Sequence, residues 1–525
     1  MKKIFAMIDK ISPSISRHFQ IIAFALFGLC ISCSPDTETR SELPNVLFVL
    51  SDDIGQGDIG FYHRERTGNR EVISTPNLDD LISSGIRFDD AHTASALCSP
   101  TRYSVMTGNY AFRCYRPFGV WSACARSGIG EGELTVGQVM KNAGYRTAFF
   151  GKWHLGGDWN IKGTEEIYRA TGTGDETTDF TKIVNGSPNH LGFDYSFMIP
   201  SGIQNNPFAY YENAKWFPLG ADSEFIVNPL LHGGFHDRKH PRYADSNWVT
   251  SEAGSRLTGR AIEFIESHVI EHPGRPFFVY FCSQAVHVPH EPPPGFFGKK
   301  VKGATLSAHG DMITELDMQV GALIETLKKN GQYENTLFIF SSDNGGLDFK
   351  NTEATGHDSS NGYRGSKGQI YEGGHRVPFI ASWPGKIKPN SVSNEPVMVH
   401  DLAATLYALT GQVMPEDQAK DSHDLLPLFL HRKGANGRTV LYLQAGGQQP
   451  KLAIRKGDWK LILQGDKDDP AVRIPLELYN LKENPYENED QELINDPEQK
   501  EIIEEMLALF NQIRDSESRT TEPVK

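Results

Sequence analysis

The chain has 525 residues, enough for three to four domains of ordinary size or for one large α/β domain with an appendage. Hydrophobic residues make up 38% and charged residues 22% with no long biased tract, which excludes a disordered, collagen-like or coiled-coil protein. The 52 Lys and Arg residues against 66 Asp and Glu residues give a net charge of −14. Because a nucleic-acid interface needs a broad basic face, nucleic acid is not expected as a partner. Any anionic substrate must be met by a few local cations.

Residues 1–32 have the pattern of a secretory signal peptide. Basic residues precede an apolar run over 21–31, which is too short to span a bilayer comfortably and is typical of an h-region. Cys33 and the polar stretch after it resemble the cleavage site of a bacterial lipoprotein, so lipidation and simple signal cleavage both remain open. We expect an exported protein, periplasmic or lipid-anchored at the outer membrane or cell surface, that meets a membrane only through that anchor.

The body of the chain alternates short apolar runs with helical patterns, as successive β-α-β units require. Strands are predicted at 45–50, 145–150, 277–281 and 336–340, and helices at 75–85, 135–144 and 311–330. Residues 156–250 are rich in Gly, Asn, Pro and aromatic residues and have weak periodicity. They predict long loops on one rim of the sheet, where specificity usually resides.

After about residue 435 the pattern changes to short strands separated by Gly and Asp turns, which predicts an antiparallel sheet. These strands are predicted at 440–443, 451–455, 459–463 and 477–481, and a helix follows from about 498 to 512. The fold class is therefore α/β, a large mostly parallel sheet sandwiched by helices, with a smaller C-terminal antiparallel sheet plus a helix. The expected domains are the signal peptide at 1–32, a main domain at 33–434 and a C-terminal α+β subdomain at 435–525.

Two polar pairs follow predicted strands of the main domain. Asp52 and Asp53 come after the first strand, and Asp343 and Asn344 come after the strand at 336–340. One such pair alone usually caps a turn, but the carboxyl ends of strands gather the ligands of an open α/β sheet, so two matching pairs favour a cation site. Ligation by oxygen alone points to Ca²⁺ or Mg²⁺ rather than Zn²⁺.

The segment Cys98-Ser-Pro-Thr-Arg102, with Thr107-Gly108 downstream, carries the strongest signal in the chain. It resembles the signature of type I sulfatases, members of the alkaline phosphatase superfamily in which this cysteine is converted to formylglycine. The resemblance extends along most of the chain. In order, the matching blocks are Asp52-Asp53, Thr75-Pro-Asn-Leu-Asp79, Cys98 to Gly108, Gly151-Lys-Trp-His-Leu-Gly156, His287-Val-Pro289, Ser342-Asp-Asn-Gly345, Arg364-Gly-Ser-Lys-Gly368 and Glu372-Gly-Gly-His-Arg-Val-Pro378.

The resemblance implies an alkaline-phosphatase-like fold, makes 33–434 the catalytic domain and makes Cys98 the nucleophile. In the family the formylglycine aldehyde is hydrated, one hydroxyl attacks sulfur, and the sulfated hemiacetal collapses by elimination to release sulfate. A diol can undo its own intermediate, whereas a serine would need water to attack the sulfate ester. The implied metal is Ca²⁺, with Mg²⁺ as the second candidate. Its implied ligands are Asp52, Asp53, Cys98, Asp343 and Asn344.

The same resemblance assigns the remaining catalytic roles. Arg102 would hold the hydrated aldehyde, Lys152 would bind the sulfate and the diol, and His154 would remove a proton during elimination. His287 would bind sulfate and protonate the leaving oxygen, to which Lys367 would also be directed. Taken singly, each of these is more typical of an ordinary loop or surface residue. Together the cations would make a local site that suits a sulfated ligand inside an acidic protein.

The expected activity is hydrolysis of sulfate esters on a sulfated oligosaccharide or polysaccharide, with a 6-O-sulfate on a galacto-configured residue favoured by analogy. The expected protein partner is a formylglycine-generating or anaerobic maturation enzyme. One alternative is a phosphodiester or phosphonate monoester hydrolase of the same superfamily. The other is an inactive glycan-binding relative, which nothing favours because every expected catalytic position is filled.

Some cysteines and histidines stay outside this assignment. Cys114 and Cys124 lie in one loop and would be able to pair in an oxidising compartment. Cys282 lies in an apolar strand and is expected to be a small buried residue. Further candidates for substrate contacts are His190, His232, His236 and His240.

Overall fold

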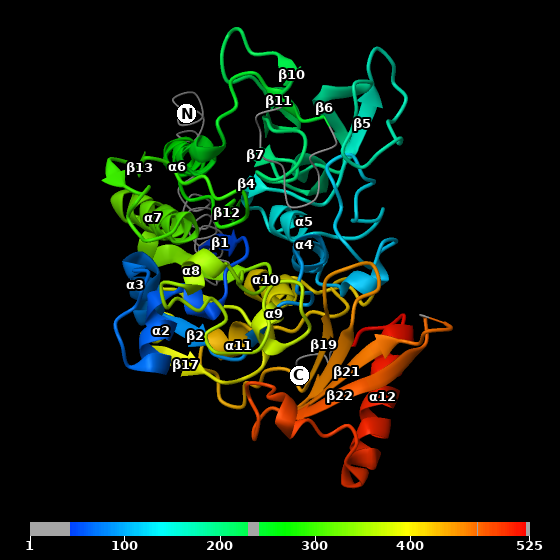
Figure 1. Ribbon diagram of the computed structural model, residues 1–525. Helices are drawn as coiled ribbons and strands as arrows, with labels where there is room; N and C mark the ends of the chain where they lie inside the picture. Colours follow the sequence, from blue (N-terminus) through cyan, green and yellow to red (C-terminus); the bar gives the residue numbers. More distant parts are fainter. Residues whose placement is uncertain (1–42, 229–240, 470, 521–525) are drawn as a thin grey trace, which may run out of the picture. The chain divides into compact units, whose positions relative to one another are not determined.

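A sheet of 12 strands runs through the described part of the chain in the order β17-β2-β16-β15-β1-β12-β4-β7-β8-β9-β6-β5 (Figure 1). Its centre is parallel. The central strands are β15 (Thr336–Ser342), β1 (Asn45–Ser51), β12 (Phe277–Cys282), β4 (Arg146–Lys152) and β7 (Tyr195–Ile199). Because these strands run the same way, their carboxyl ends all lie along one edge of the sheet.

The computed structural model describes residues 43–228, 241–469 and 471–520. The signal peptide expected at 1–32, Cys33 and the histidines at 232, 236 and 240 lie outside the described residues. None of the helices within the described ranges combines the length and the apolar character needed to cross a membrane.

Strand β1 shows why the centre of the sheet forms. Its sequence is a run of apolar, mostly β-branched or bulky residues, and every residue of the strand is buried. Val46 pairs with Phe278 of β12 on one side and with Leu337 of β15 on the other. Such runs are typical of parallel strands that helices cover on both faces.

The flanks of the sheet are mainly antiparallel, so the expectation of a mostly parallel sheet holds for its centre. Strand β16 (Phe379–Ser382) pairs antiparallel with β15 and with β2 (Ile86–Phe88), which pairs in parallel with β17 (Ser391–Ser393). On the other flank, β8 (Tyr210–Glu212) pairs antiparallel with β7. The α/β class and the separate C-terminal sheet are confirmed.

The prediction of long loops over 156–250 is wrong. The segment contains β7 and β8 and the further strands β5 (Asp158–Ile161), β6 (Thr178–Asn185), β9 (Lys215–Phe217), β10 (Phe225–Val227) and β11 (Tyr243–Asp245). Its aromatic residues build a core here, since Trp159 lies 5.7 Å from Phe180 and 5.3 Å from Tyr211 between ring centroids. The strands are short and several are buried on both faces, so they lack the alternation that reveals a strand in sequence.

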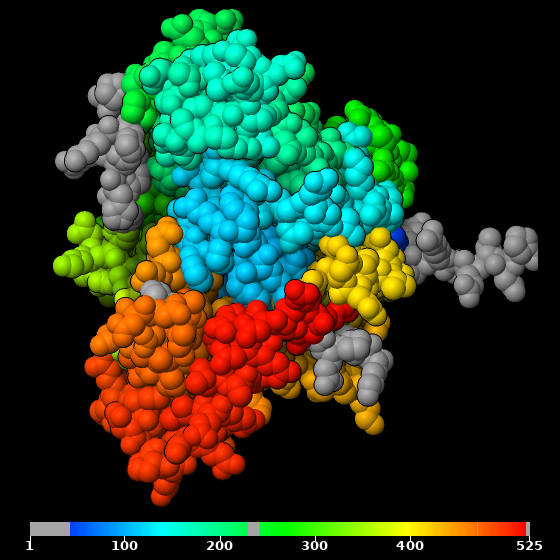
Figure 2. All heavy atoms as spheres, turned by 90° about the vertical axis from the view of Figure 1, so that its right-hand side faces the viewer, coloured from blue at the N-terminus to red at the C-terminus, as the bar shows by residue number. Residues whose placement is uncertain are grey.

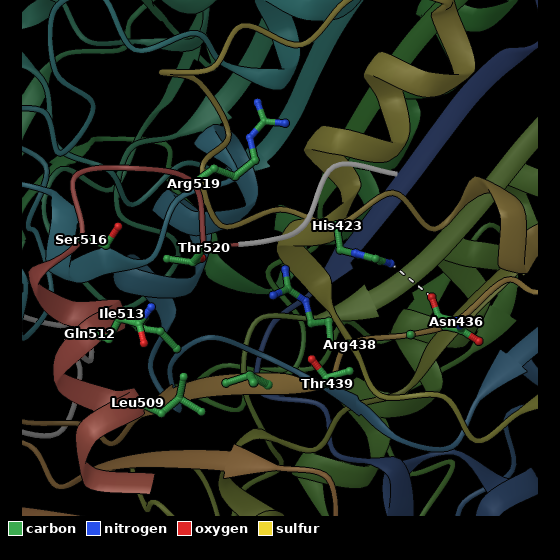
Figure 3. A pocket seen from close by; sticks show the side chains of 12 residues that line it. His423, Asn436, Arg438, Thr439, Leu509, Gln512, Ile513, Ser516, Arg519 and Thr520 are labelled. Atoms are coloured by element: carbon green, nitrogen blue, oxygen red, sulfur yellow. Dashed lines mark hydrogen bonds between the residues drawn. The ribbon is translucent and has the colours of Figure 1, made fainter. Parts of the chain in front are cut away.

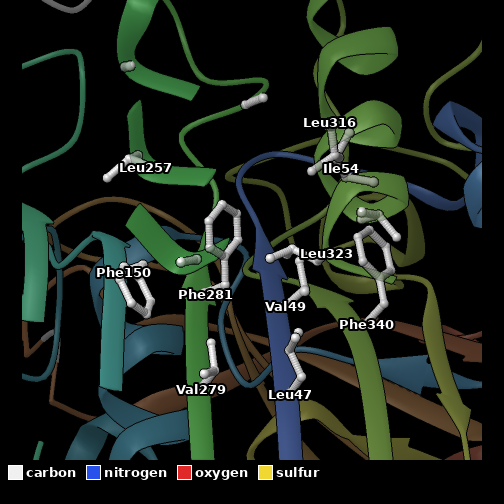
Figure 4. Packing of buried hydrophobic residues seen from close by; sticks show 14 of the residues in the cluster. Leu47, Val49, Ile54, Phe150, Leu257, Val279, Phe281, Leu316, Leu323 and Phe340 are labelled. Carbon is white, nitrogen blue, oxygen red and sulfur yellow. The ribbon is translucent and has the colours of Figure 1, made fainter. Parts of the chain in front are cut away.

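Helices cover both faces of the sheet. On one face, α3 (Pro76–Ser84), α6 (Ala253–Glu271) and α7 (Ala308–Lys329) share a core with Leu47, Val49 and Phe281 (Figure 4). On the other, Gly137 of α5 (Val136–Asn142) packs against Phe193, whose ring contacts Phe149 and Tyr280. Helix α5 also contacts α4 (Cys98–Thr107) and α10 (Leu402–Thr410). The remaining short elements are α2 (Gly60–Thr67), β3 (Ala91–His92), β13 (Gly295–Phe296), β14 (Lys299–Lys300), α8 (Lys350–Glu353), α9 (Glu372–His375), β18 (Val397–Met398) and α11 (Leu426–Phe429).

Helix α7 buries a carboxyl group, which predicts a pH-dependent stability. Glu315 accepts from Gln284 Nε2 at 3.2 Å and Gln319 Nε2 at 3.4 Å, and burial raises its pKa to about 8. In an unfolded chain the pKa of a glutamate is about 4.3. Between these pH values the folded protein retains a proton that the unfolded chain releases, so this group lowers the free energy of unfolding as pH rises.

Glu315→Gln should therefore raise the free energy of unfolding at pH 8 by a few kcal/mol, about 1.4 kcal/mol for each pKa unit removed. The difference from wild type should shrink towards pH 4. Denaturant midpoints across this pH range test the prediction, with Glu325→Gln on the exposed side of the same helix as the matched control. A constant difference at every pH would contradict it.

The C-terminal prediction is confirmed. Strands β19 (Val440–Gln444), β20 (Leu452–Lys456), β21 (Trp459–Gly465) and β22 (Arg473–Asn480) form an antiparallel sheet, and α12 (Lys500–Asp515) packs on it. The rings of Tyr442 and Phe510 stack at 5.2 Å between centroids. In Figure 2 this orange and red part lies against the blue and cyan part of the chain. Ion pairs join the two parts, such as that of Arg455 with Asp90 at 2.7 Å. The domain boundary at residue 434 stays a prediction.

Candidate active site

The carboxyl edge of the parallel strands gathers most of the predicted site residues. Asp52 and Asp53 follow β1, Lys152 is the last residue of β4, His287 lies in the loop after β12, and Asp343 follows β15. The sequence placed the end of β4 at Phe150, two residues too early. All five side chains are buried although four of them are ordinarily charged, and each must therefore be paired.

Helix α4 begins at Cys98, so Arg102 lies about one turn along the helix. Its guanidinium Nε and Nη2 donate to Asp343 Oδ2 at 2.9 and 2.8 Å, and Nη1 donates to the Lys152 carbonyl at 3.1 Å. The arginine thus holds a predicted metal ligand and the end of β4 together. Its predicted contact with the hydrated aldehyde stays a prediction.

Two ammonium groups neutralise the first acidic pair. Lys152 Nζ donates to both carboxylate oxygens of Asp52, at 2.9 and 2.7 Å. Lys367 Nζ lies 2.6 Å from Asp53 Oδ1 and donates to Oδ2 at 2.7 Å. Burial alone would raise the pKa of Asp53, but Lys367, His287 and Lys152 lower it well below its usual range. Burial would lower the pKa of Lys367, but Asp53 raises it, so this lysine stays charged.

Cys98 lies among these charges. Burial would raise the pKa of its thiol, but Lys152, Lys367 and His287 lower it. His287 Nδ1 lies 2.8 Å from the carbonyl of Val288 and must donate to it. The neutral ring therefore keeps Nε2 free of a proton, facing Asp53 Oδ2 at 3.8 Å. Burial, then Lys367 and Lys152, lower the pKa of His287.

His154 is held in an unusual backbone conformation, with φ of 58°, and its N–H donates to the carbonyl of Pro200 at 2.9 Å. The side chain is 2% exposed, and neither ring nitrogen has a hydrogen-bond partner within the described residues. Burial, followed by the charges of Lys152 and Arg102, lowers its pKa well below the usual value. A neutral imidazole with open nitrogens is suited to accept a proton.

The residues present fit a divalent cation. Ligand atoms of Asp52, Asp53, Cys98 and His287 lie within 4.8 Å of one another. Burial, then the neighbouring Asp343 and Asp53, raise the pKa of Asp52 to about 7 despite its lysine partner. Asn344 donates through Nδ2 to Asp53 Oδ1 at 2.9 Å, while its buried Oδ1 has no partner in the described part of the chain. Crowded carboxylates beside an open amide oxygen are the donor set that Ca²⁺ and Mg²⁺ take.

A second buried group, His92, Glu372 and His375, also has metal-ligand character. Lys460 Nζ, from β21, already lies among these side chains, 2.9 Å from Glu372 Oε1 and 3.1 Å from His375 Nε2. The ammonium group already supplies the positive charge for this buried carboxylate. This network ties β21 of the C-terminal sheet to β3 and α9, and we assign no chemistry to Glu372.

A cavity of about 420 Å³ lies beside α12 (Figure 3). His423, Arg438, Leu509, Arg519 and Thr520 are among its lining residues, and none of the predicted site residues lines it. Its cations already have partners, since Arg438 Nε donates to Asp401 Oδ2 at 2.9 Å and Arg519 Nη2 donates to the Pro415 carbonyl at 2.9 Å. We assign no chemistry to it.

The structure describes most of the cysteines and histidines that the family resemblance left unassigned. Cys114 and Cys124 are both free thiols, so the pairing left open by the sequence does not occur in this structure. Cys282 is 1% exposed, as expected. His190 is exposed and its Nδ1 is hydrogen-bonded to Ser187 Oγ at 2.7 Å. Sequence reasoning missed Gln204, a buried residue near Lys152, because a lone glutamine in a loop has no distinguishing pattern.

The fold and the arrangement at the sheet edge define a hydrolase of the alkaline phosphatase superfamily. Residues 44–412 match the family model described as Sulfatase, and residues 365–516 match N-sulphoglucosamine sulphohydrolase, C-terminal. The chain therefore belongs to the sulfatase family and is a sulfuric ester hydrolase. The family implies a formylglycine made from cysteine and a divalent metal.

Relatives with known names agree with this assignment. The chain is 30% identical to an N-acetylgalactosamine-6-O-sulfatase of Bacteroides thetaiotaomicron, over 91% of this chain and 94% of the relative. It is 31% identical to human N-acetylgalactosamine-6-sulfatase, over 84% and 78% of the two chains. A solved sulfatase structure from work on glycosaminoglycan metabolism by B. thetaiotaomicron has a TM-score of 0.74 at 28% identity, covering 91% of this chain and all of the other (100%). A phosphonate monoester hydrolase of Agrobacterium radiobacter, at 16% identity and a TM-score of 0.56, shares the fold alone.

Proposed function

We propose that this protein hydrolyses sulfate esters on a sulfated glycan and releases inorganic sulfate, with Cys98 as the position of the formylglycine nucleophile. The observation that carries the proposal is the meeting of Cys98 with Lys152, Lys367 and buried carboxylates at one sheet edge. Relatives that act on N-acetylgalactosamine sulfates support a sugar as the substrate. The phosphonate alternative has only the shared fold in its favour.

The proposed cation is Ca²⁺, with Mg²⁺ as the second candidate. Asp52, Asp53, Asp343, Asn344 and the modified Cys98 would hold it. When present, the cation would stabilise negative charge on the sulfuryl oxygens, and formylglycine would supply a hydroxyl nucleophile. Arg102 contributes indirectly, because its two hydrogen bonds fix the carboxylate of Asp343.

The chain's own cations bind and orient the ester. Lys152 and Lys367 are held by the adjacent residues Asp52 and Asp53, so a sulfate group would meet two ammonium donors in a buried, low-dielectric site. Charge that develops on the sulfuryl oxygens is stabilised by donors already in place. This pre-organisation costs little reorganisation during the reaction.

The two histidines have separate proposed roles. His154 is neutral, and its ring nitrogens have no partner in the described structure. It takes the proton of the nucleophile's remaining hydroxyl during release of sulfate. His287, with Lys367, has its proposed role at the leaving oxygen, where a proton must be supplied. Because Nδ1 donates to the Val288 carbonyl, Nε2 must first take up a proton before it can bind the sulfate or donate to that oxygen. Each role requires contact with the reacting atoms.

For substrate we propose a 6-O-sulfate on a galacto-configured residue, by analogy with the N-acetylgalactosamine-6-sulfatase relatives. The protein should release sulfate from one regioisomer at least ten times faster than from the others, because contacts remote from sulfur orient only the correct ester. Chondroitin, heparin and algal galactan oligosaccharides of defined sulfation, with a generic aryl sulfate as reference, provide the screen. Equal rates on all of them would contradict selectivity, and faster turnover of phosphodiesters would favour the alternative activity.

The proposed location is outside the cytoplasm, periplasmic or lipid-anchored at the outer membrane or cell surface, because of the signal pattern at 1–32 and Cys33. A formylglycine-generating or anaerobic maturation enzyme is the proposed protein partner. Mass spectrometry of the mature N-terminus tests the anchor.

A further inference from the structure

The loop that follows β7 buries polar groups with nothing to bond. Ser201 is fully buried and Gln204 is 3% exposed. Ser201 Oγ and both carboxamide atoms of Gln204 lack hydrogen-bond partners within residues 43–228, 241–469 and 471–520. A buried carboxamide left unpaired costs about 1–3 kcal/mol, so such a group calls for a partner, which a water or a bound ligand supplies.

This loop runs directly beside the catalytic segment. Trp153 N donates to the Ile199 carbonyl at 3.0 Å, and His154 N donates to the Pro200 carbonyl at 2.9 Å. A Cβ added at Gly202 would lie 2.5 Å from Gln204 Oε1 and 2.9 Å from Lys152 Cδ. The carboxamide therefore lies beside the stem of Lys152, whose ammonium group we assign to the sulfate.

The polar groups gathered here point to one kind of ligand. Gln204 offers both a donor and an acceptor, and both are open. A sulfate oxygen can only accept, so it would leave one carboxamide atom unpaired, and Lys152 and Lys367 already supply donors for it. A hydroxyl group donates and accepts at once, which satisfies the carboxamide.

We propose that Gln204, supported by Ser201, hydrogen-bonds to a ring hydroxyl of the sulfated sugar and thereby selects sugar sulfates over sulfate esters that lack such a hydroxyl. The inference rests on the proposed sugar sulfatase activity and adds a specificity-determining residue to it. Reading a hydroxyl in this way is selective, because an ester without it leaves the buried carboxamide unpaired.

Gln204→Leu tests the contact, since leucine keeps the volume and removes the hydrogen bonds. On the sulfated sugar that wild type cleaves fastest, kcat/KM should fall about 10- to 100-fold, the loss expected for one buried hydrogen bond. On 4-nitrophenyl sulfate the rate should stay close to that of wild type. Tyr210→Phe is the matched control, because it removes another buried, unpartnered hydroxyl of the described chain, from β8, and should change neither rate.

Analogues of the sugar that each lack one hydroxyl group identify the hydroxyl that Gln204 contacts. With wild-type protein, kcat/KM for one of these analogues should be lower than for the normal sugar by about the factor that Gln204→Leu causes with the normal sugar. The variant should have the same kcat/KM for that analogue and for the normal sugar. Equal losses on the sugar and on 4-nitrophenyl sulfate would show that Gln204 only positions Lys152 and would overturn the proposal. Unchanged rates on both would overturn it as well.

Failure of the proposed function would appear differently, as wild-type protein that releases sulfate from no sugar. The contact is still measurable then, by calorimetric binding of N-acetylgalactosamine 6-sulfate to Cys98→Ala protein with and without Gln204→Leu. Weaker binding in the double variant supports the contact, and equal binding rejects it.

Discussion

Cys98→Ser and Cys98→Ala are expected to lower the rate of sulfate release by roughly four to six orders of magnitude, the range for loss of a nucleophile that acts with its neighbours as a unit. Lys152, Lys367 and His287 all converge on this position. Alanine removes the nucleophile. Serine keeps one oxygen, but a sulfate transferred to it has no neighbouring hydroxyl to expel it.

Sulfate release from the preferred substrate measures this effect, and mass spectrometry of the peptide that contains residue 98 shows whether the wild-type residue is formylglycine. Cys114→Ser provides the matched control, because this buried free thiol lies outside the site and its loss should leave the rate unchanged. A fully active wild-type protein with an unmodified thiol at Cys98 would refute the mechanism.

Asp343→Ala should remove the bound cation and reduce the rate by at least about a thousandfold, comparable to the loss of one main electrostatic contact in a catalytic site. It should also lower stability by about 3–5 kcal/mol, because Arg102, 1% exposed, then loses the carboxylate that receives two of its hydrogen bonds. Elemental analysis is expected to find calcium in wild type and its loss in the variant.

Asp421→Ala separates the two effects. Asp421 is fully buried and accepts from Arg113 Nε and Nη2 at 2.7 and 2.9 Å, but it belongs to the contact with the C-terminal part of the chain. This control should lose stability and keep both metal and rate at temperatures where it remains folded. Retention of metal and rate in Asp343→Ala would rule out the proposed ligand set, and magnesium in place of calcium would favour the second candidate.

Much of the site followed from local sequence. Strand β1 was visible because it is a continuous apolar run, and Asp52 and Asp53 follow it directly. Parallel strands present their carboxyl ends at one edge, so the sequence alone predicts that the aspartates after β1 and β15 meet. Arg102 is four residues after Cys98, which is about one turn of the helix α4 that begins at Cys98.

The strands between residues 156 and 250 were missed because sequence reveals a strand through alternation or through a long apolar run, and most of these strands are short and separated by turns and loops. Strand β7 shows the consequence, since it pairs in parallel with β4 in the centre of the sheet. Its position depends on contacts with distant strands, which no local pattern encodes.

The sequence by itself determined the sulfatase family, the α/β class and the residue types that the chemistry needs, because those depend on short ordered motifs and strong local patterns. Only the tertiary structure decided the pairings: Lys152 with Asp52, Lys367 with Asp53 and Arg102 with Asp343. It also revealed Gln204 as a buried amide without a partner among the described residues. Partners and burial are set by which distant segments pack together, and the free energy of placing a charge or an amide there depends on those neighbours.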